Sequence, residues 1–209
     1  MKKVALLGKG SLAIKVGKWL NASNNFSLTR VVPNAHEPEW TELLSEWALK
    51  EGLHVIHGGH YKDLDPEHVD IVFSVFYDKI INKKFIDRCK CIINLHNAPL
   101  PKYRGVSPIN WALKNNESYH GVTIHKISPG IDNGDILGMI TYPIYPEIEE
   151  VRDVYEKSLV YGYELFKDVF TKFDHSFENA KPQEGEVIYK HSGENKFLGN
   201  RKSWSRHES

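Results

Sequence analysis

The chain has 209 residues, and its 27 Lys and Arg are balanced by 27 Asp and Glu, so its formal net charge at pH 7 is zero. This balance excludes a strong overall electrostatic attraction to nucleic acid or to an anionic membrane. The length fits one α/β domain, which we expect at residues 1–200 with a polar tail at 201–209.

Two further signals concern the compartment. The start, MKKVALLGKG, has only a short apolar run before Gly8, too little for a secretory signal, and no apolar run approaches the roughly 20 residues that a spanning helix requires. Cys89 and Cys91 are one residue apart, which favours reduced thiols over a disulfide framework. We therefore expect a cytoplasmic protein that binds neither nucleic acid nor membrane.

The first predicted strand, at 3–7, is followed by a glycine-rich turn. The turn at 8–13 reads G-x-G-x-x-A, which invites a dinucleotide-binding interpretation, but the next predicted strand, at 27–32, does not end in the required acidic residue. We interpret the turn as one whose backbone N–H groups around Gly10 and Ser11 contact a substrate phosphate. A tight turn without a ligand is the equal alternative.

Residues 38–51 show helical spacing of their apolar side chains, with Trp40 on the predicted packing face. Three histidines follow at intervals of three: His54, His57 and His60. A short strand that runs into a glycine turn would not place three imidazoles on one face, and no carboxylate or cysteine completes a ligand set nearby. We therefore predict surface or loop histidines and no metal.

A central apolar strand is predicted at 70–77 and a short helix at 82–88. The next apolar run, at 91–93, leads into Asn94 and His96. Side chains at i and i+2 of an extended strand point to the same side, and ligands of open α/β sheets bind beyond the carboxyl ends of the strands. This pair is therefore a candidate site.

Loop chemistry separates this strand from the next helix. The segment at 99–105 must be an ordered loop, because its prolines remove backbone donors and fix φ. Ser107 is a candidate helix cap and Pro108 suits the first helical position. Regular alternation predicts a strand at 121–127, in which we assign His125 to the strand surface.

The turn-rich segment at 128–135 is able to carry Asp132 back toward the preceding polar pair. A strand at 136–142 and a long amphipathic helix at 149–173 follow. Polar turn residues at 181–186 then precede a short extended piece.

At this point the motifs carry a resemblance. The segment N-x-H-x-x-x-L-P-x-x-R-G-x-x-P-x-x-W-A from Asn94, followed by G-V-T-x-H at 121–125 and D-x-G-D-I-L at 132–137, resembles the formyltransferase family that uses N10-formyltetrahydrofolate. The resemblance implies a Rossmann-like α/β fold, with a mostly parallel central sheet and helices on both faces. It also implies that Asn94, His96 and Asp132 are catalytic.

The same resemblance implies contacts to the folate co-substrate and to the acceptor. The folate candidates are Phe76, Tyr77, Asp78, Ile80, Ile131 and Asp135. Ordinary packing is the equal alternative for Phe76 and Tyr77. The acceptor candidates are Gly10, Ser11, Lys79 and Arg104. A solvated lysine and a structural arginine are the alternatives for the last two.

The implied reaction is attack of an amine on the formyl carbon. Asn94 can donate its side-chain N–H to the developing oxyanion, and a protonated His96 can donate there too. Asp132 can orient His96, and either group can shuttle the proton from the attacking amine to the departing folate nitrogen. This scheme needs neither a metal nor a covalent enzyme intermediate.

The acceptor implied by the resemblance is a nucleotide-linked amino sugar of a surface-polysaccharide pathway, because P-I-N-W-A at 108–112 looks like the sugar enzymes. Methionyl-tRNA formyltransferases carry an additional tRNA-binding domain, for which too little chain follows the core. The alternatives are glycinamide ribonucleotide formylation, hydrolysis of formyltetrahydrofolate, and a non-catalytic module that binds a nucleotide sugar or NAD. A homodimer is left open.

Overall fold

The computed structural model describes residues 1–198, and the polar tail predicted at 201–209 lies outside them. The described chain divides into two compact units. The N-terminal unit comprises Met1–Leu95 with Lys126–Pro129, and the C-terminal unit comprises His96–His125 with the residues from Gly130 on. Among residues 1–198, no helix has the length and apolar character needed to cross a membrane.

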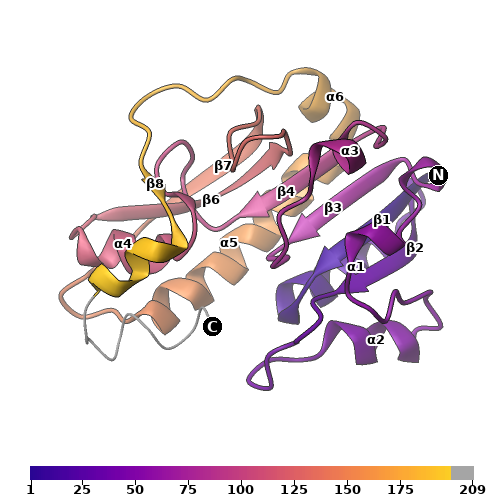
Figure 1. The fold of residues 1–209 in the computed structure, drawn as a ribbon, viewed down its shortest axis with the longest axis horizontal. Coiled ribbons are helices and arrows are strands. Elements are labelled where there is room, and N and C mark those ends of the chain that lie inside the picture. Colours follow the sequence, from indigo (N-terminus) through magenta and orange to yellow (C-terminus); the bar gives the residue numbers. More distant parts are fainter. Residues whose placement is uncertain (199–209) are drawn as a thin grey trace. The chain divides into compact units, whose positions relative to one another are not determined.

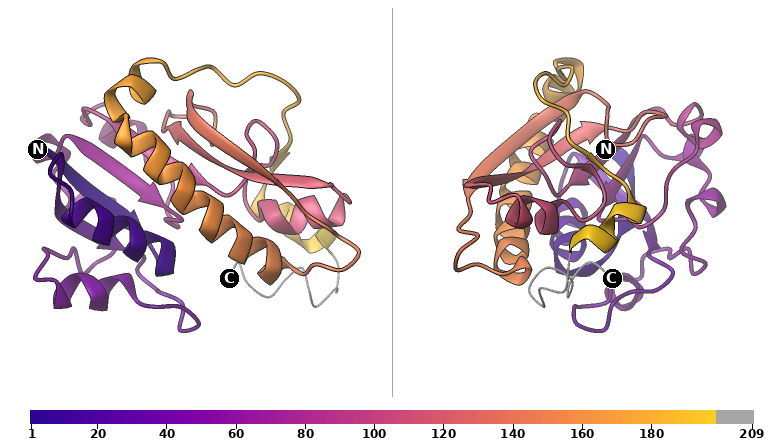
Figure 2. Two further views of the ribbon diagram at one scale, coloured as in Figure 1. Left: turned by 180° about the vertical axis from the view of Figure 1, so that it is seen from behind. Right: turned by 60° about the vertical axis from the view of Figure 1, so that its left-hand side comes forward.

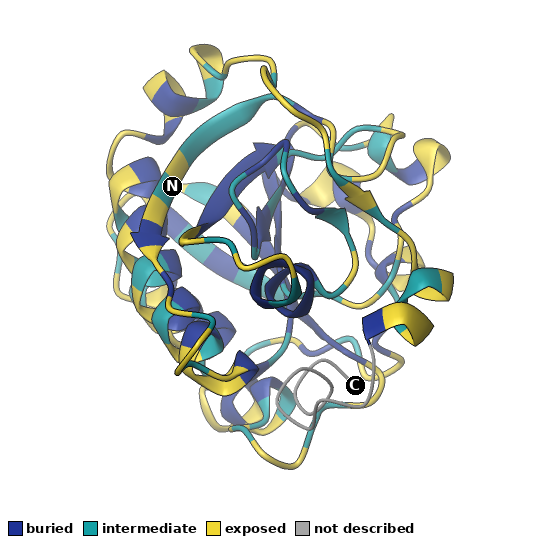
Figure 3. Cartoon of the chain, turned by 90° about the vertical axis from the view of Figure 1, so that its left-hand side faces the viewer, coloured by how far each residue is buried: buried dark blue, intermediate teal, exposed yellow. Residues whose placement is uncertain are grey.

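The N-terminal unit is built on parallel strands in the order β2-β1-β3-β4 (Figure 1). These strands are β1 (Lys2–Gly8), β2 (Phe26–Pro33), β3 (Ile71–Val75) and β4 (Ile92–His96). Most of β1 and all of β3 are buried, as continuous apolar runs predict for strands covered on both faces (Figure 3). The sheet is mostly parallel and flanked by helices, which confirms the predicted fold class.

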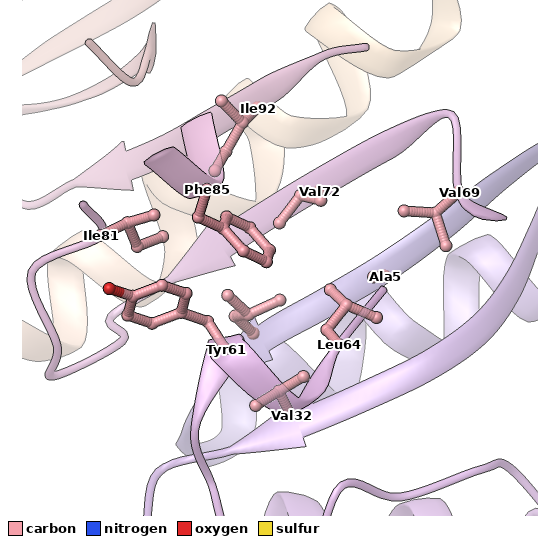
Figure 4. Close-up of a cluster of buried hydrophobic side chains, with 10 residues drawn as sticks. Ala5, Val32, Tyr61, Leu64, Val69, Val72, Ile81, Phe85 and Ile92 are labelled. Atoms are coloured by element: carbon pink, nitrogen blue, oxygen red, sulfur yellow. The ribbon is translucent and has the colours of Figure 1, made fainter. Parts of the chain in front are cut away.

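Helical segments cover both faces of this parallel sheet. The helices α1 (Gly10–Asn21) and α2 (Leu44–Lys50) pack against each other and against β2. The opposite layer contains the short helices η1 (Tyr61–Asp63), η2 (Pro66–His68) and α3 (Lys83–Ile86). An apolar cluster joins this layer to all four strands (Figure 4): Ala5, Leu7, Val32, Tyr61, Leu64, Val69, Val72, Ile81, Phe85 and Ile92.

The helix predicted at 38–51 is wrong over its first half, because α2 begins only at Leu44. The carboxylate of Glu37 accepts hydrogen bonds from the backbone N–H groups of Leu44 and Ser45. Such N–H groups have no partner within a helix, so a side chain that precedes the predicted helix fixes its actual start. Trp40 was expected on the packing face and is 46% exposed.

The strand predicted at 70–77 is also shorter in the structure. It ends at Val75, because Phe76 adopts a left-handed backbone with φ 56° and so turns the chain out of the sheet. The helix predicted at 82–88 is present as the single turn of α3, and the side chain of Asn82 caps it by accepting from the N–H of Phe85.

The C-terminal unit combines an antiparallel strand pair with helices. β6 (Tyr119–Lys126) pairs with β7 (Ile136–Pro143), and the long helix α5 (Val151–Thr171) packs along β7 (Figure 2). The other elements are β5 (Arg104–Gly105), α4 (Pro108–Lys114), α6 (Phe173–Glu178), β8 (Tyr189–Lys190) and η3 (Ser192–Leu198). β5 and β8 form a short parallel pair.

The long helix predicted at 149–173 is confirmed as α5 with shorter bounds. It begins after Glu150, whose side chain forms a capping box with Asp153, and a second helix, α6, follows it. Its predicted packing side is buried at most positions: Val151, Val154, Leu159, Leu165, Phe166 and Val169.

Ser107 occupies the N-cap position of α4, as predicted, but its side chain does not cap the helix. Ser107 has a left-handed backbone, with φ 53°, and its side chain makes no capping hydrogen bond. Its hydroxyl oxygen instead accepts a hydrogen bond from the side-chain amide of Asn195, at 3.1 Å. Pro108 does occupy the first turn of α4, as predicted.

Candidate active site

Asn94 lies in the N-terminal unit, where the strand register fixes its side chain. It is opposite Ser74 in the neighbouring strand β3, and the Ser74 hydroxyl donates to the side-chain oxygen of Asn94 at 2.7 Å. Because this oxygen is held by Ser74, the orientation of the Asn94 amide is set within the sheet itself.

The C-terminal unit brings His96 and Asp132 together, as the turn-rich loop predicts. His96 is the last residue of β4 and is 8% exposed. Its Nε2 lies 2.9 Å from the carbonyl oxygen of Tyr103, and its Nδ1 lies 3.6 Å from Oδ2 of Asp132. Both ring nitrogens of His96 therefore face oxygen atoms of the protein.

His125 is a third member of this cluster, and its assignment to the strand surface is wrong. It is 2% exposed, and its Nε2 lies 3.6 Å from Oδ1 of Asp132. Its ring meets that of His96 edge to face, with 6.2 Å between the centroids. Regular alternation suggested one wet face for β6, but both faces of this strand are buried. The available signal was the G-V-T-x-H motif, which contains His125.

Asp132 is held as a carboxylate between these two histidines. Its Oδ2 also accepts a hydrogen bond from the backbone N–H of Gly105 at 2.9 Å. Burial by itself raises the pKa of this carboxyl group, but the charge of His96, the interaction with His125 and the Gly105 N–H outweigh burial. The pKa of Asp132 therefore lies well below its usual range, and the group is ionised at neutral pH.

The predicted folate loop after β3 lies in the N-terminal unit. The carbonyl oxygen of Phe76 accepts from the side chain of Asn34 at 3.4 Å. The hydroxyl of Tyr77 donates to the carbonyl of Gly59 at 2.8 Å and accepts from the N–H of Tyr61 at 2.9 Å. Burial raises the pKa of Tyr77 to about 12. The Tyr77 hydroxyl is thus committed to bonds within the protein.

The other folate candidates differ in exposure. Asp78 forms an ion pair with Lys79 at 3.4 Å, and the apolar side chain of Ile80 is 77% exposed. Ile131 and Asp135 lie in the C-terminal unit, on the loop that carries Asp132, and Ile131 is 37% exposed.

The residues predicted to bind the acceptor substrate contact other residues of the protein. The N–H of Ser11, in the first turn of α1, donates to the hydroxyl oxygen of Thr41 at 3.3 Å. Gly10 has φ 74°, and a Cβ at this position would meet the same threonine. Arg104 donates from Nε and from a terminal nitrogen to Oε1 of Gln183, at 3.0 and 2.7 Å.

The candidate residues are therefore distributed over both units. The C-terminal unit assembles His96, His125 and Asp132, with Arg104 in the adjoining β5. Asn94, the loop after β3 and the turn before α1 belong to the N-terminal unit. Within residues 1–198, no group of three or more His, Cys, Asp or Glu side chains is arranged to hold a metal ion.

A family model described as formyl transferase matches residues 58–170, which is more than half of the chain. The methionyl-tRNA formyltransferase of Finegoldia magna is 29% identical over 193 residues, covering 87% of this chain and 62% of the relative. That of Thermodesulfovibrio yellowstonii is 40% identical over 130 residues, covering 61% of this chain and 41% of the relative. The chain thus spans less than two thirds of the length of these relatives.

Solved structures give a second comparison. The N-formyltransferase from Helicobacter canadensis, in complex with folinic acid and dTDP-3-aminofucose, superimposes with a TM-score of 0.75 at 26% identity, covering 91% of this chain and 71% of that one. Glycinamide ribonucleotide transformylase 1 from Symbiobacterium toebii shares the fold, with a TM-score of 0.71 at 16% identity over 89% of this chain and 95% of that one. By the extent of the family match and by its fold, the chain belongs to the formyl transferase family.

Proposed function

We propose that this protein transfers a formyl group from N10-formyltetrahydrofolate to the amine of a nucleotide-linked amino sugar. The observation that carries the proposal is the largely buried carboxylate of Asp132, which lies 3.6 Å from both His96 and His125. Formyl transfer to an amine requires a group that accepts a proton and a group that returns it. A carboxylate that stays ionised next to an imidazole stabilises the protonated imidazole, so the pair suits both tasks.

Two of the residues expected to bind the formyl donor expose apolar surface, which suits a partly apolar molecule. Ile80 and Ile131 are 77% and 37% exposed, each on a loop that the family resemblance assigns to the folate. Phe76 holds its loop in a left-handed turn that Asn34 supports through the Phe76 carbonyl. The donor supplies an activated formyl carbon, and the loop after β3 would hold its ring system.

The roles of the catalytic residues follow from their donors and acceptors. The side-chain N–H of Asn94 would stabilise the negative charge that develops on the formyl oxygen. The pair of His96 and Asp132 would take the proton that the attacking amine loses and return it to the departing nitrogen, with the Asp132 carboxylate stabilising the protonated imidazole. One C–N bond forms and one breaks, with no net change in the protein.

The sugar acceptor is supported by a related protein rather than by a contact in this one. The Helicobacter canadensis enzyme was crystallised with an amino sugar linked to dTDP, and it is 26% identical to this chain. The P-I-N-W-A segment at 108–112, which suggested a sugar enzyme, is buried throughout.

A second candidate acceptor is the amino group of methionyl-tRNA. It is favoured by the curated relatives of this chain, several of which are methionyl-tRNA formyltransferases, at up to 40% identity in the examples above. The balanced charge of the chain favours the smaller acceptor.

The experiment that tests the proposal measures release of tetrahydrofolate from N10-formyltetrahydrofolate with the purified protein. The acceptors are none, glycinamide ribonucleotide, methionyl-tRNA, and a panel of amino sugars linked to UDP, dTDP and GDP, with each product checked by mass. One added formyl group on a sugar nucleotide is the expected result. Turnover with glycinamide ribonucleotide or methionyl-tRNA, and none with the sugars, would show that the acceptor is one of those two molecules and not an amino sugar. Release of tetrahydrofolate without any acceptor would show that the protein is a hydrolase.

A further inference from the structure

One side chain from the C-terminal part of the chain fastens the loop that carries Asp132. The amide nitrogen of Gln183 donates to the carbonyl oxygens of Asp132 and Gly134, at 2.8 Å each. The amide oxygen of Gln183 accepts both N–H groups offered by Arg104, at 3.0 and 2.7 Å. An amide has two N–H donors and one oxygen with two lone pairs, so this side chain uses its full hydrogen-bonding capacity here.

The backbone around Gln183 is attached on both sides of this contact. Lys181 and Ile136 exchange two backbone hydrogen bonds, of 2.7 and 2.9 Å, directly after the Asp132 loop. Further along, the N–H of Arg104 donates to the carbonyl of Ile188 at 2.8 Å, directly before β8, which pairs with β5. The segment 181–190 therefore bridges the start of β7 and β5, and it places Gln183 between them.

The loop has a physical reason to need such support. Asp132 has φ 47°, in the left-handed region that side chains other than glycine rarely adopt. A residue in that conformation keeps it only where the surroundings hold it. The side-chain carboxylate of Asp132 accepts a hydrogen bond from the N–H of Gly105, and the backbone carbonyl of Asp132 accepts one from Gln183. Two neighbouring residues of β5 thus act on Asp132, Gly105 directly and Arg104 through Gln183.

We propose that Gln183 is a positioning residue for the Asp132 carboxylate and that Arg104 holds Gln183 in place. This inference rests on the proposed function, and it lies outside the part of the chain that matches the family, because Gln183 follows residue 170. It assigns to Arg104 a partner within the protein in place of the acceptor. Gln183 has no contact with a reacting atom in this assignment, and it acts through the geometry of the Asp132 loop.

The kinetic test compares Gln183→Ala and Gln183→Glu with Glu184→Ala, a control at the exposed neighbouring position. Gln183→Glu keeps an oxygen for Arg104 but has no N–H for the loop, so it separates the two halves of the contact. We expect both Gln183 variants to lose at least about tenfold in kcat, with KM for donor and acceptor within about twofold of wild type. The Glu184→Ala control should keep wild-type kinetics.

A double-mutant cycle distinguishes positioning from general destabilisation. If Gln183 acts through Asp132, Gln183→Ala should change kcat by less than about twofold in an Asp132→Asn background. A role in stability alone would lower the melting temperature and would reduce kcat by the same factor in both backgrounds. That pattern, or wild-type kcat in Gln183→Glu, would overturn the assignment.

A readout without substrates keeps this inference separate from the proposed function. Amide hydrogen exchange at Gly105 reports the bond from its N–H to the Asp132 carboxylate. We expect exchange at Gly105 to rise at least about tenfold in Gln183→Ala and to stay unchanged in Glu184→Ala. If no acceptor is formylated by the wild type, the function fails while this result still decides the inference. Unchanged exchange in Gln183→Ala overturns the inference even where formyl transfer is found.

Discussion

Among single residues, Asp132 and His96 have the clearest chemical assignment. Both are largely buried, and the interactions of Asp132 with the two histidines keep its carboxylate ionised. We expect Asp132→Asn and His96→Ala each to reduce kcat by at least about 100-fold, because the first removes the charge that supports proton transfer and the second removes the imidazole. Steady-state release of tetrahydrofolate measures this effect. A folded variant of either kind that works at near the wild-type rate would remove the proposed mechanism.

Substitution of His125 should have a smaller effect on kcat. His125 lies next to Oδ1 of Asp132, whereas His96 lies next to Oδ2. His125→Gln retains an N–H donor in a side chain of similar reach. We expect a loss of about tenfold in kcat for His125→Gln and a larger loss for His125→Ala, which leaves a cavity and an unpaired carboxylate oxygen. Kinetics and thermal unfolding of both variants measure the difference. Equal kinetics in the two would show that the N–H of His125 has no role.

These residues also show what the sequence could predict about single side chains. The spacing of Asn94 and His96 and the turn chemistry before Asp132 led to the correct expectation that His96 and Asp132 meet. His125 was missed because alternation reports which side of a strand a residue faces, and not whether that side is wet. The partner of Arg104 could not be predicted, since Gln183 lies 79 residues away along the chain.

Among the elements, the turn from β1 into α1 depends on a glycine for a steric reason. Gly8 has φ 147°, and a Cβ there would lie 1.9 Å from the carbonyl oxygen of Val75. We expect Gly8→Ala to lower the free energy of unfolding by at least about 2 kcal/mol, because the parallel pairing of β1 with β3 would have to shift. Urea denaturation measures the change.

Gly52 is the matched control for this prediction. It also has a positive φ, of 70°, but no atom lies within 4 Å of the position that a Cβ would take. Gly52→Ala should therefore cost only the backbone strain, about 1 kcal/mol. If both substitutions lower the free energy of unfolding by the same amount, the backbone near Val75 moves away from the new Cβ at no cost in stability.

Element boundaries were less predictable than the elements themselves, and the causes are local. α2 starts six residues later than the helix predicted from 38, because Glu37 binds the N–H groups of Leu44 and Ser45 from outside the apolar pattern. β3 stops at Val75 because the next residue takes a left-handed backbone. Hydrophobic periodicity predicts the buried strands, but it does not predict a side-chain cap or a positive φ.

For the molecule as a whole, the buried histidine His120 predicts how stability depends on pH. It has no exposed surface, and its Nε2 lies 2.9 Å from the carbonyl oxygen of Asn97. Burial lowers the pKa of His120 to about 4, against an ordinary value of 6.5. The unfolded chain therefore takes up a proton below pH 6.5 that the folded chain takes up only near pH 4. Stability should fall through this interval, by about 3 kcal/mol in total.

Asp132 adds a second decrease at lower pH. Its pKa is depressed in the folded state, so its contribution to stability is complete above the ordinary value of 3.8 and is lost as the pH falls below it. Urea denaturation at pH 7.5, 5.5 and 4.5 isolates the first decrease. We expect His120→Gln, which retains a donor for Asn97, to remove most of the slope between these values, and His57→Gln, at an exposed position, to leave it unchanged. A slope that persists in His120→Gln would assign the pH dependence to other groups and would mean that His120 is accessible to protons in the folded chain.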